Sequence, residues 1–240
     1  MLAMTPKNYV LVHGAYHGAW CWKDVAAGLR ALGHRVATPT WTGLGERSHL
    51  LKFGPTLETF IEDVAQVIRY EDLEDVVLVG HSFAGSVVSA LADRMPQRLR
   101  HLVYLDALVL RSGESSASRS PERIAAYRAR AMASDDPLGI PPADPAHFGI
   151  TDPHQAAWLQ PKLTPHPLQS YYDPLHLQHP LGNGLPATYI ACTEPYFAST
   201  ALSREIAKAT PGWTCLEIPT AHDAMVLMPR ELTAMLAAIG

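Results

Sequence analysis

Six short apolar runs rich in β-branched residues recur along the 240-residue chain, and they limit the possible folds more than any other feature of the sequence. Runs of four or five such residues have the length of buried strands, and most are followed by a segment with helical spacing. Continuous apolar strands that alternate with helices predict a parallel sheet in an α/β fold. The runs lie at residues 9–12, 35–38, 76–79, 102–105, 188–191 and 214–218.

Helices are predicted between these runs. Residues 23–32 end at Gly33, which is a common helix stop, and residues 57–70 place Phe60, Val64 and Ile68 along one face. A further helix is expected after Ser82, and another at residues 231–239. A chain of this length fits one α/β domain with an insertion.

The segment from residue 108 to residue 185 breaks the alternation of strands and helices. More than half of the 20 prolines lie in it, so regular elements cannot continue through it. We predict an inserted cap at 108–185, with one helix at 121–132, on a core formed by 1–107 and 186–240. An irregular surface insertion without a role in substrate binding is the alternative.

Composition excludes several classes of protein. Hydrophobic residues make up 48% of the chain. The 19 basic and 23 acidic side chains give a net charge of −4, so a nucleic-acid or membrane partner is not expected. The three cysteines, Cys21, Cys192 and Cys215, are far apart and form no C-x-x-C pair, which argues against a disulfide framework or a zinc ribbon. Without a signal peptide or a long apolar run, we expect a cytoplasmic protein. The sequence leaves a homodimer open.

The segment 76–85 carries the strongest chemical signal, because an apolar strand runs directly into Ser82 and then into a helix. Such a sharp turn holds a nucleophilic serine in a strained conformation, and the residues two positions away must be small. Gly80 and Ala84 meet this requirement, although the usual motif has glycine where Ala84 stands; Gly85 follows it directly. An ordinary helix-capping serine is the alternative.

A nucleophilic serine needs a base, and the base needs an acid that orients it. We predict that His222 is the base, because its loop follows the last predicted strand and so lies at the same sheet edge as Ser82. Two carboxylates compete for the third role, since Asp106 and Glu194 each follow a predicted strand. We favour Asp106, because its apolar surroundings require a partner for an ionised carboxylate, and keep Glu194 as the alternative acid.

The oxyanion of an acyl-transfer reaction needs two N–H donors. We predict the backbone N–H of Phe83, next to the nucleophile, and that of Ala15, in the glycine-rich loop after the first strand. His13 and His17 in this loop are four residues apart, but the intervening glycines break any helix and no H-E-x-x-H motif is present. We therefore expect no metal site.

Taken together, these motifs resemble the α/β-hydrolase superfamily, and within it the branch that holds plant hydroxynitrile lyases and methylesterases. The likeness is strongest to small bacterial esterases of this branch, including carbamate-cleaving esterases. It implies a mostly parallel sheet of about six strands, a serine mechanism without cofactors, and small esters as substrates. The stretches that carry it are 13–22, 42–49, 80–85, 104–107 and 221–225.

Two departures from the lyase pattern favour hydrolysis. The lyases carry threonine where this chain has Gly14, and a lysine directly after the histidine where it has Asp223. An acidic residue there would oppose an anionic leaving group. A hydroxynitrile lyase-like enzyme, a cofactor-free dioxygenase-like enzyme and a non-catalytic small-ligand receptor remain the alternatives.

The sequence therefore predicts a serine carboxylesterase that cleaves small aromatic or short-chain esters or carbamates through an acyl-enzyme. Aromatic and apolar side chains under the cap are expected to line its substrate pocket. The predicted pocket residues, besides Phe83, are His17, Trp20, Met132, Trp158 and Tyr171.

Overall fold

Six parallel strands form the central sheet of the computed structural model, which describes residues 6–239. The spatial order β2-β1-β3-β4-β7-β8 places β3 and β4 at its centre. All six predicted runs are strands of this sheet, so the α/β prediction is confirmed. The strands are β1 (Asn8–Val12), β2 (Arg35–Ala37), β3 (Val76–His81), β4 (Leu99–Leu105), β7 (Ala187–Cys192) and β8 (Trp213–Ile218).

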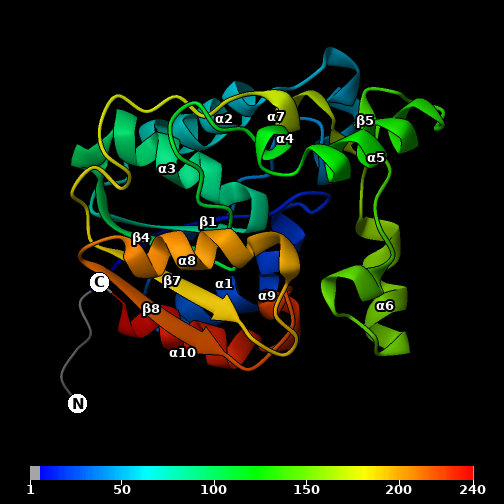
Figure 1. Ribbon diagram of the computed structural model, residues 1–240. Helices are drawn as coiled ribbons and strands as arrows, with labels where there is room; N and C mark the ends of the chain where they lie inside the picture. Colours follow the sequence, from blue (N-terminus) through cyan, green and yellow to red (C-terminus); the bar gives the residue numbers. More distant parts are fainter. Residues whose placement is uncertain (1–5, 240) are drawn as a thin grey trace.

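Helices cover both faces of the sheet (Figure 1). The side chains of β3 alternate between these faces: Val76 and Leu78 pack into one apolar cluster with α2 and α3, and Val77 and Val79 into another with α1 and α10. This double burial explains why the strands are continuously apolar. The helices are α1 (Lys23–Ala31), α2 (Leu57–Tyr70), α3 (Gly85–Arg94), α8 (Ala201–Ala209), α9 (Ala224–Leu227) and α10 (Pro229–Ala238).

The chain between β4 and β7 consists of short elements separated by loops. Pro121 and Pro153 each begin a helix, where the missing N–H costs nothing, and the predicted helix 121–132 is confirmed as α5. Side chains such as Ile124 and Leu159 join the cluster of α2 and α3, so this segment packs on the same core. Its elements are α4 (Ser116–Arg119), α5 (Pro121–Met132), β5 (Gly139–Ile140), α6 (Pro153–Leu159), β6 (His166–Pro167) and α7 (Gln169–Tyr172).

The division into core and cap at residues 107/108 and 185/186 stays a prediction. Both points lie in loops, after β4 and before β7. Across residues 6–239, no helix is both long and apolar enough to cross a membrane.

Candidate active site

Ser82 lies at the turn where β3 passes into α3 through the 3-10 helix Ser82–Ala84. Its φ of 55° is in the left-handed region, which non-glycine residues adopt only when the surrounding structure holds them there. A Cβ at Gly80 would lie 2.5 Å from Val88 and 3.0 Å from the Ala84 carbonyl oxygen, so the turn requires glycine at that position. A Cβ at Gly85 would lie closer still to the Leu108 carbonyl oxygen. The sequence thus provides glycine at the two places where the backbone has no room for a side chain.

His222 lies between the hydroxyl of Ser82 and the carboxylate of Asp106. Its Nε2 is 2.9 Å from Ser82 Oγ and its Nδ1 is 2.6 Å from Asp106 Oδ2. When Nδ1–H donates to the carboxylate, Nε2 is left with a lone pair that can accept the serine proton. The three residues follow β3, β4 and β8, and therefore meet at the carboxyl edge of the parallel sheet.

Asp106 is fully buried, and several groups compensate for its charge. Its Oδ1 accepts a hydrogen bond of 2.9 Å from Thr200 Oγ1, and Arg204 Nη1 lies 3.7 Å from the same oxygen. Arg204 also donates to Thr200 Oγ1 at 2.8 Å, which orients the hydroxyl. Glu194, the alternative acid, has an exposed side chain. The geometry therefore places Asp106, and not Glu194, against His222.

The two predicted oxyanion donors lie beside Ser82. Ala15 and Phe83 both line the cavity at Ser82. The loop after β1 passes so close that a Cβ at Gly14 would lie 2.8 Å from Ser82 Cβ, and His17 Nδ1 donates to the Ala15 carbonyl at 2.7 Å. This bond fixes the peptide plane next to the predicted donor. The oxyanion role of both N–H groups stays a prediction.

A buried ion pair joins this loop to the loop that carries His222. His17 Nε2 lies 3.0 Å from Asp223 Oδ2, and both side chains are almost completely buried. Burial opposes the charge on both, but their mutual attraction outweighs it, so that the pKa of His17 is raised and that of Asp223 is lowered. Asp223 thus pairs with His17 and does not line the catalytic pocket, contrary to the expectation that it faces the leaving group.

Burial disfavours the charged form of two neighbouring histidines. Burial holds the pKa of His81 well below its ordinary value, and its Nε2 donates to the His222 carbonyl at 3.0 Å. Burial also lowers the pKa of His13 to about 3, and its Nε2 accepts from the Trp41 N–H. Both rings therefore hold backbone in place. Within residues 6–239, no group of three or more His, Cys, Asp or Glu side chains is arranged to hold a metal ion.

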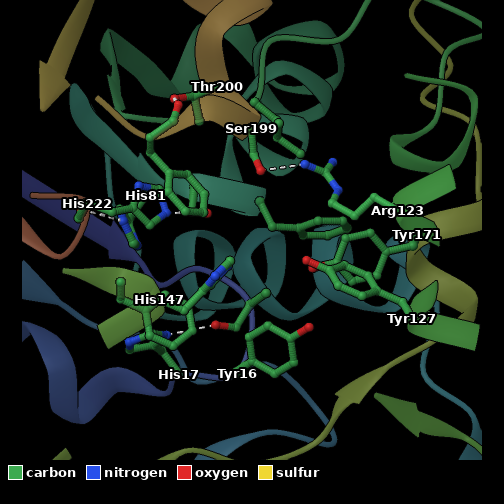
Figure 2. A pocket seen from close by; sticks show the side chains of 16 residues that line it. Tyr16, His17, His81, Arg123, Tyr127, His147, Tyr171, Ser199, Thr200 and His222 are labelled. Carbon is green, nitrogen blue, oxygen red and sulfur yellow. Dashed lines mark hydrogen bonds between the residues drawn. The ribbon is translucent and has the colours of Figure 1, made fainter. Parts of the chain in front are cut away.

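Aromatic rings dominate the walls of the pocket above Ser82, as Figure 2 shows. Of the predicted pocket residues, His17, Phe83 and Tyr171 line it. The residues that sequence reasoning missed come largely from irregular segments whose position no periodicity reveals. They are Tyr16, His81, Leu108, Arg123, Tyr127, His147, Phe148, Phe197, Ser199 and Thr200. Arg123 and Tyr127 have the i, i+4 spacing of one helix face, which was the available signal.

Three predicted pocket residues lie elsewhere. Met132 ends α5 and is 64% exposed, because the helix turns its Arg123–Tyr127 face toward the pocket. Trp158 lines a separate cavity beside α1, and Trp20 lies between it and the pocket. The Trp20 ring stacks on His17 at 5.3 Å between centroids and meets Trp158 edge-on at 5.6 Å. Trp20 therefore supports a wall residue from behind.

Comparison with known proteins agrees with this geometry. The sequence model of the "Alpha/beta hydrolase family" matches residues 9–235. A carbendazim hydrolyzing esterase from Nocardioides sp. is 40% identical over 97% of this chain and 99% of its own length. Methylesterase 1 of Arabidopsis thaliana is 35% identical over 43% of this chain and 40% of its own length.

One solved structure has the same fold over nearly the full length of both chains. It is an extracellular alpha/beta-hydrolase from a Paenibacillus species, described as sharing structural and functional homology with tobacco salicylic acid binding protein 2. The two superpose with a TM-score of 0.83 at 25% identity, over 98% of this chain and 99% of that one. The family model matches nearly the whole sequence, and a full-length relative is 40% identical. The chain therefore belongs to the alpha/beta hydrolase family.

Proposed function

We propose that the protein is a serine esterase that cleaves small esters or carbamates through an acyl-enzyme formed on Ser82. The observation that carries this proposal is the unbroken chain of contacts from Ser82 Oγ through His222 to the buried Asp106 carboxylate. The esterase names of the relatives support it, and the carbendazim hydrolyzing relative points to carbamates as one substrate class.

The reaction follows from the geometry. Ser82 Oγ attacks the substrate carbonyl carbon while its proton passes to His222 Nε2, and Asp106 stabilises the imidazolium through Nδ1–H. The N–H groups of Ala15 and Phe83 hold the negative charge that develops on the carbonyl oxygen. The Nε2 proton then goes to the leaving alcohol or amine. Water repeats the sequence to release the acyl group and restore the serine.

The pocket walls favour flat or short acyl groups. Phe83, Phe148, Tyr171 and Phe197 present rings around Ser82 and His222, and the Phe197 ring stacks on His222 at 3.9 Å between centroids. Aromatic walls bind planar aromatic groups by offset or edge contacts. Aromatic and short-chain esters therefore remain the proposed substrates.

The lyase and cofactor-free dioxygenase alternatives would use the same residues without an acyl-enzyme. The lyases carry a lysine directly after the histidine to stabilise departing cyanide, and no lysine is among the described residues that line the pocket; the guanidinium that does line it, Arg123, comes from α5 and donates to Ser199. This favours hydrolysis. A receptor would show no turnover of any ester. The cytoplasmic location and the homodimer stay predictions.

Steady-state hydrolysis of p-nitrophenyl acetate and butyrate by the wild type and by Ser82→Ala tests the proposal. We expect turnover by the wild type and a loss of at least a thousandfold in the variant. Equal rates in both proteins, or no turnover by a folded wild type, would exclude the acyl-enzyme mechanism.

A further inference from the structure

The pocket at Ser82 is small compared with most sites for organic ligands. Its volume is about 40 Å³, whereas sites for small organic ligands usually measure about 300–1,000 Å³. A second cavity of about 520 Å³ lies beside it, lined by residues of α4, the start of α5 and the 3-10 helix Ala198–Thr200. Leu108, Arg123 and Ser199 line both cavities. These three residues therefore form the wall between them.

A single hydrogen bond between side chains closes this wall. Arg123 Nη1 donates to Ser199 Oγ at 2.5 Å, and Figure 2 shows this bond at the side of the pocket. It joins α5, in the segment between β4 and β7, to the 3-10 helix that also supplies Thr200 to Asp106. Neither side chain takes part in the hydrogen bonds among Ser82, His222, Asp106 and Thr200, so an exchange of this bond for one to a ligand breaks none of them.

Arg123 lacks the partners that a partly buried guanidinium usually has. Its Nε is buried without a hydrogen-bond acceptor. Within residues 6–239, no carboxylate lies within 4.0 Å of it, whereas Arg119 on the neighbouring helix pairs with Glu114 at 2.9 Å. An unpaired buried donor and an uncompensated charge both cost free energy. A ligand acceptor would satisfy the donor, and an anionic one would also compensate the charge.

We propose that the two cavities form one substrate site and that Arg123 determines specificity by binding a hydrogen-bond acceptor in the bulky part of the substrate. The scissile carbonyl lies at Ser82, and the remainder of the substrate passes Arg123 into the larger cavity. The acceptor is a carboxylate, a carbonyl or a ring nitrogen, each of which fits the guanidinium fork. This inference rests on the proposed esterase function and names the substrate class of that site.

Three p-nitrophenyl esters with the same six-carbon acyl chain test it: the hexanoate, which ends in methyl, the adipic monoamide ester and the adipic monoester. Hydrogen bonds to charged groups typically change affinity by a factor of ten or more. We expect Arg123→Ala to lower kcat/KM for the amide-ended or carboxylate-ended ester at least tenfold relative to the hexanoate. A loss for the carboxylate ester alone identifies an anionic acceptor, and a loss for both shows that a neutral carbonyl suffices.

Two further variants complete the test. Arg128→Ala removes an exposed arginine of the same helix, and all three esters should keep their wild-type ratios. Ser199→Ala frees Arg123 without removing it, so kcat/KM for the acceptor-ended esters should rise severalfold relative to p-nitrophenyl acetate.

Two results would overturn the inference: an equal fall for all three esters in Arg123→Ala, which a structural role would cause, or unchanged ratios in Arg123→Ala. Absence of acetate turnover by the wild type would instead refute the proposed esterase function.

Discussion

Replacing Asp106 with asparagine keeps the shape of the side chain but reverses its hydrogen bond to His222. Thr200 donates to Oδ1, so the amide oxygen of the variant would take that position and the amide nitrogen would face His222 Nδ1. An N–H donor there requires Nδ1 to accept. The imidazole proton would then lie on Nε2, which faces Ser82 Oγ and could no longer accept the serine proton.

The expected loss follows from this tautomer change. In a Ser-His-Asp triad with unchanged geometry, the same substitution lowers kcat by about 10⁴-fold, which corresponds to about 5.4 kcal/mol of transition-state stabilisation. We expect a loss of the same size here, because His222 Nδ1 lies 2.6 Å from Asp106 Oδ2 and Asp106 is fully buried.

The assay is kcat for p-nitrophenyl acetate hydrolysis by Asp106→Asn, with Glu194→Gln as the matched control. Glu194 is the other candidate acid and has an exposed side chain, so its variant should stay within about twofold of the wild type. A loss below tenfold in Asp106→Asn, or a larger loss in Glu194→Gln, would refute the assignment of the acid. Circular dichroism of both variants checks that the fold is intact.

Two other substitutions probe the surroundings of the triad. Gly14→Ala would place a methyl group 2.8 Å from Ser82 Cβ and 2.9 Å from His81 Nδ1. We expect a loss of about 1–3 kcal/mol in unfolding free energy, measured by urea unfolding, together with a lower kcat for ester turnover. A fully active and stable variant would contradict the close approach. Asp223→Asn breaks the ion pair with His17 and should lower the unfolding free energy by about 3 kcal/mol. Because the pKa of Asp223 is lowered in the folded state, its charge stabilises the fold fully above about pH 3.8. Because the pKa of His17 is raised, its charge stabilises the fold fully below about pH 6.5, and this contribution is lost as the pH rises further. The difference in unfolding free energy between wild type and variant should therefore be largest between these two pH values. Urea titrations from pH 4 to 9 measure it, and a pH-independent difference would show that the pair is not ionised.

The sheet and the nucleophile turn could be predicted from the sequence because each depends on local pattern. Strand β3 is apolar on both faces because both faces are covered, and Gly80 and Gly85 stand where a Cβ would clash. Chain order and strand ends then placed His222 at the same edge as Ser82. These inferences need only short-range information and the rule that parallel strands end together.

The choice of acid and the pocket depend on contacts that sequence pattern does not encode. Asp106 and Glu194 both follow strands, and only the three-dimensional structure shows that Thr200 and Arg204 approach Asp106. In the pocket, α5 presents Arg123 toward Ser82, whereas Met132 at its end lies on the surface. Residue type alone suggested the opposite, since methionine is apolar and arginine is charged.

The proposed mechanism requires Ser82 to form a covalent acyl intermediate. Labelling with phenylmethylsulfonyl fluoride, followed by intact mass and peptide mapping, tests it most directly, because a sulfonyl group stays on the serine that the neighbouring histidine activates. We expect one adduct per chain, located on Ser82 and absent from Ser82→Ala, with loss of ester turnover in proportion to labelling. A folded, active wild type that acquires no adduct, or an adduct on another residue that abolishes turnover, would contradict it.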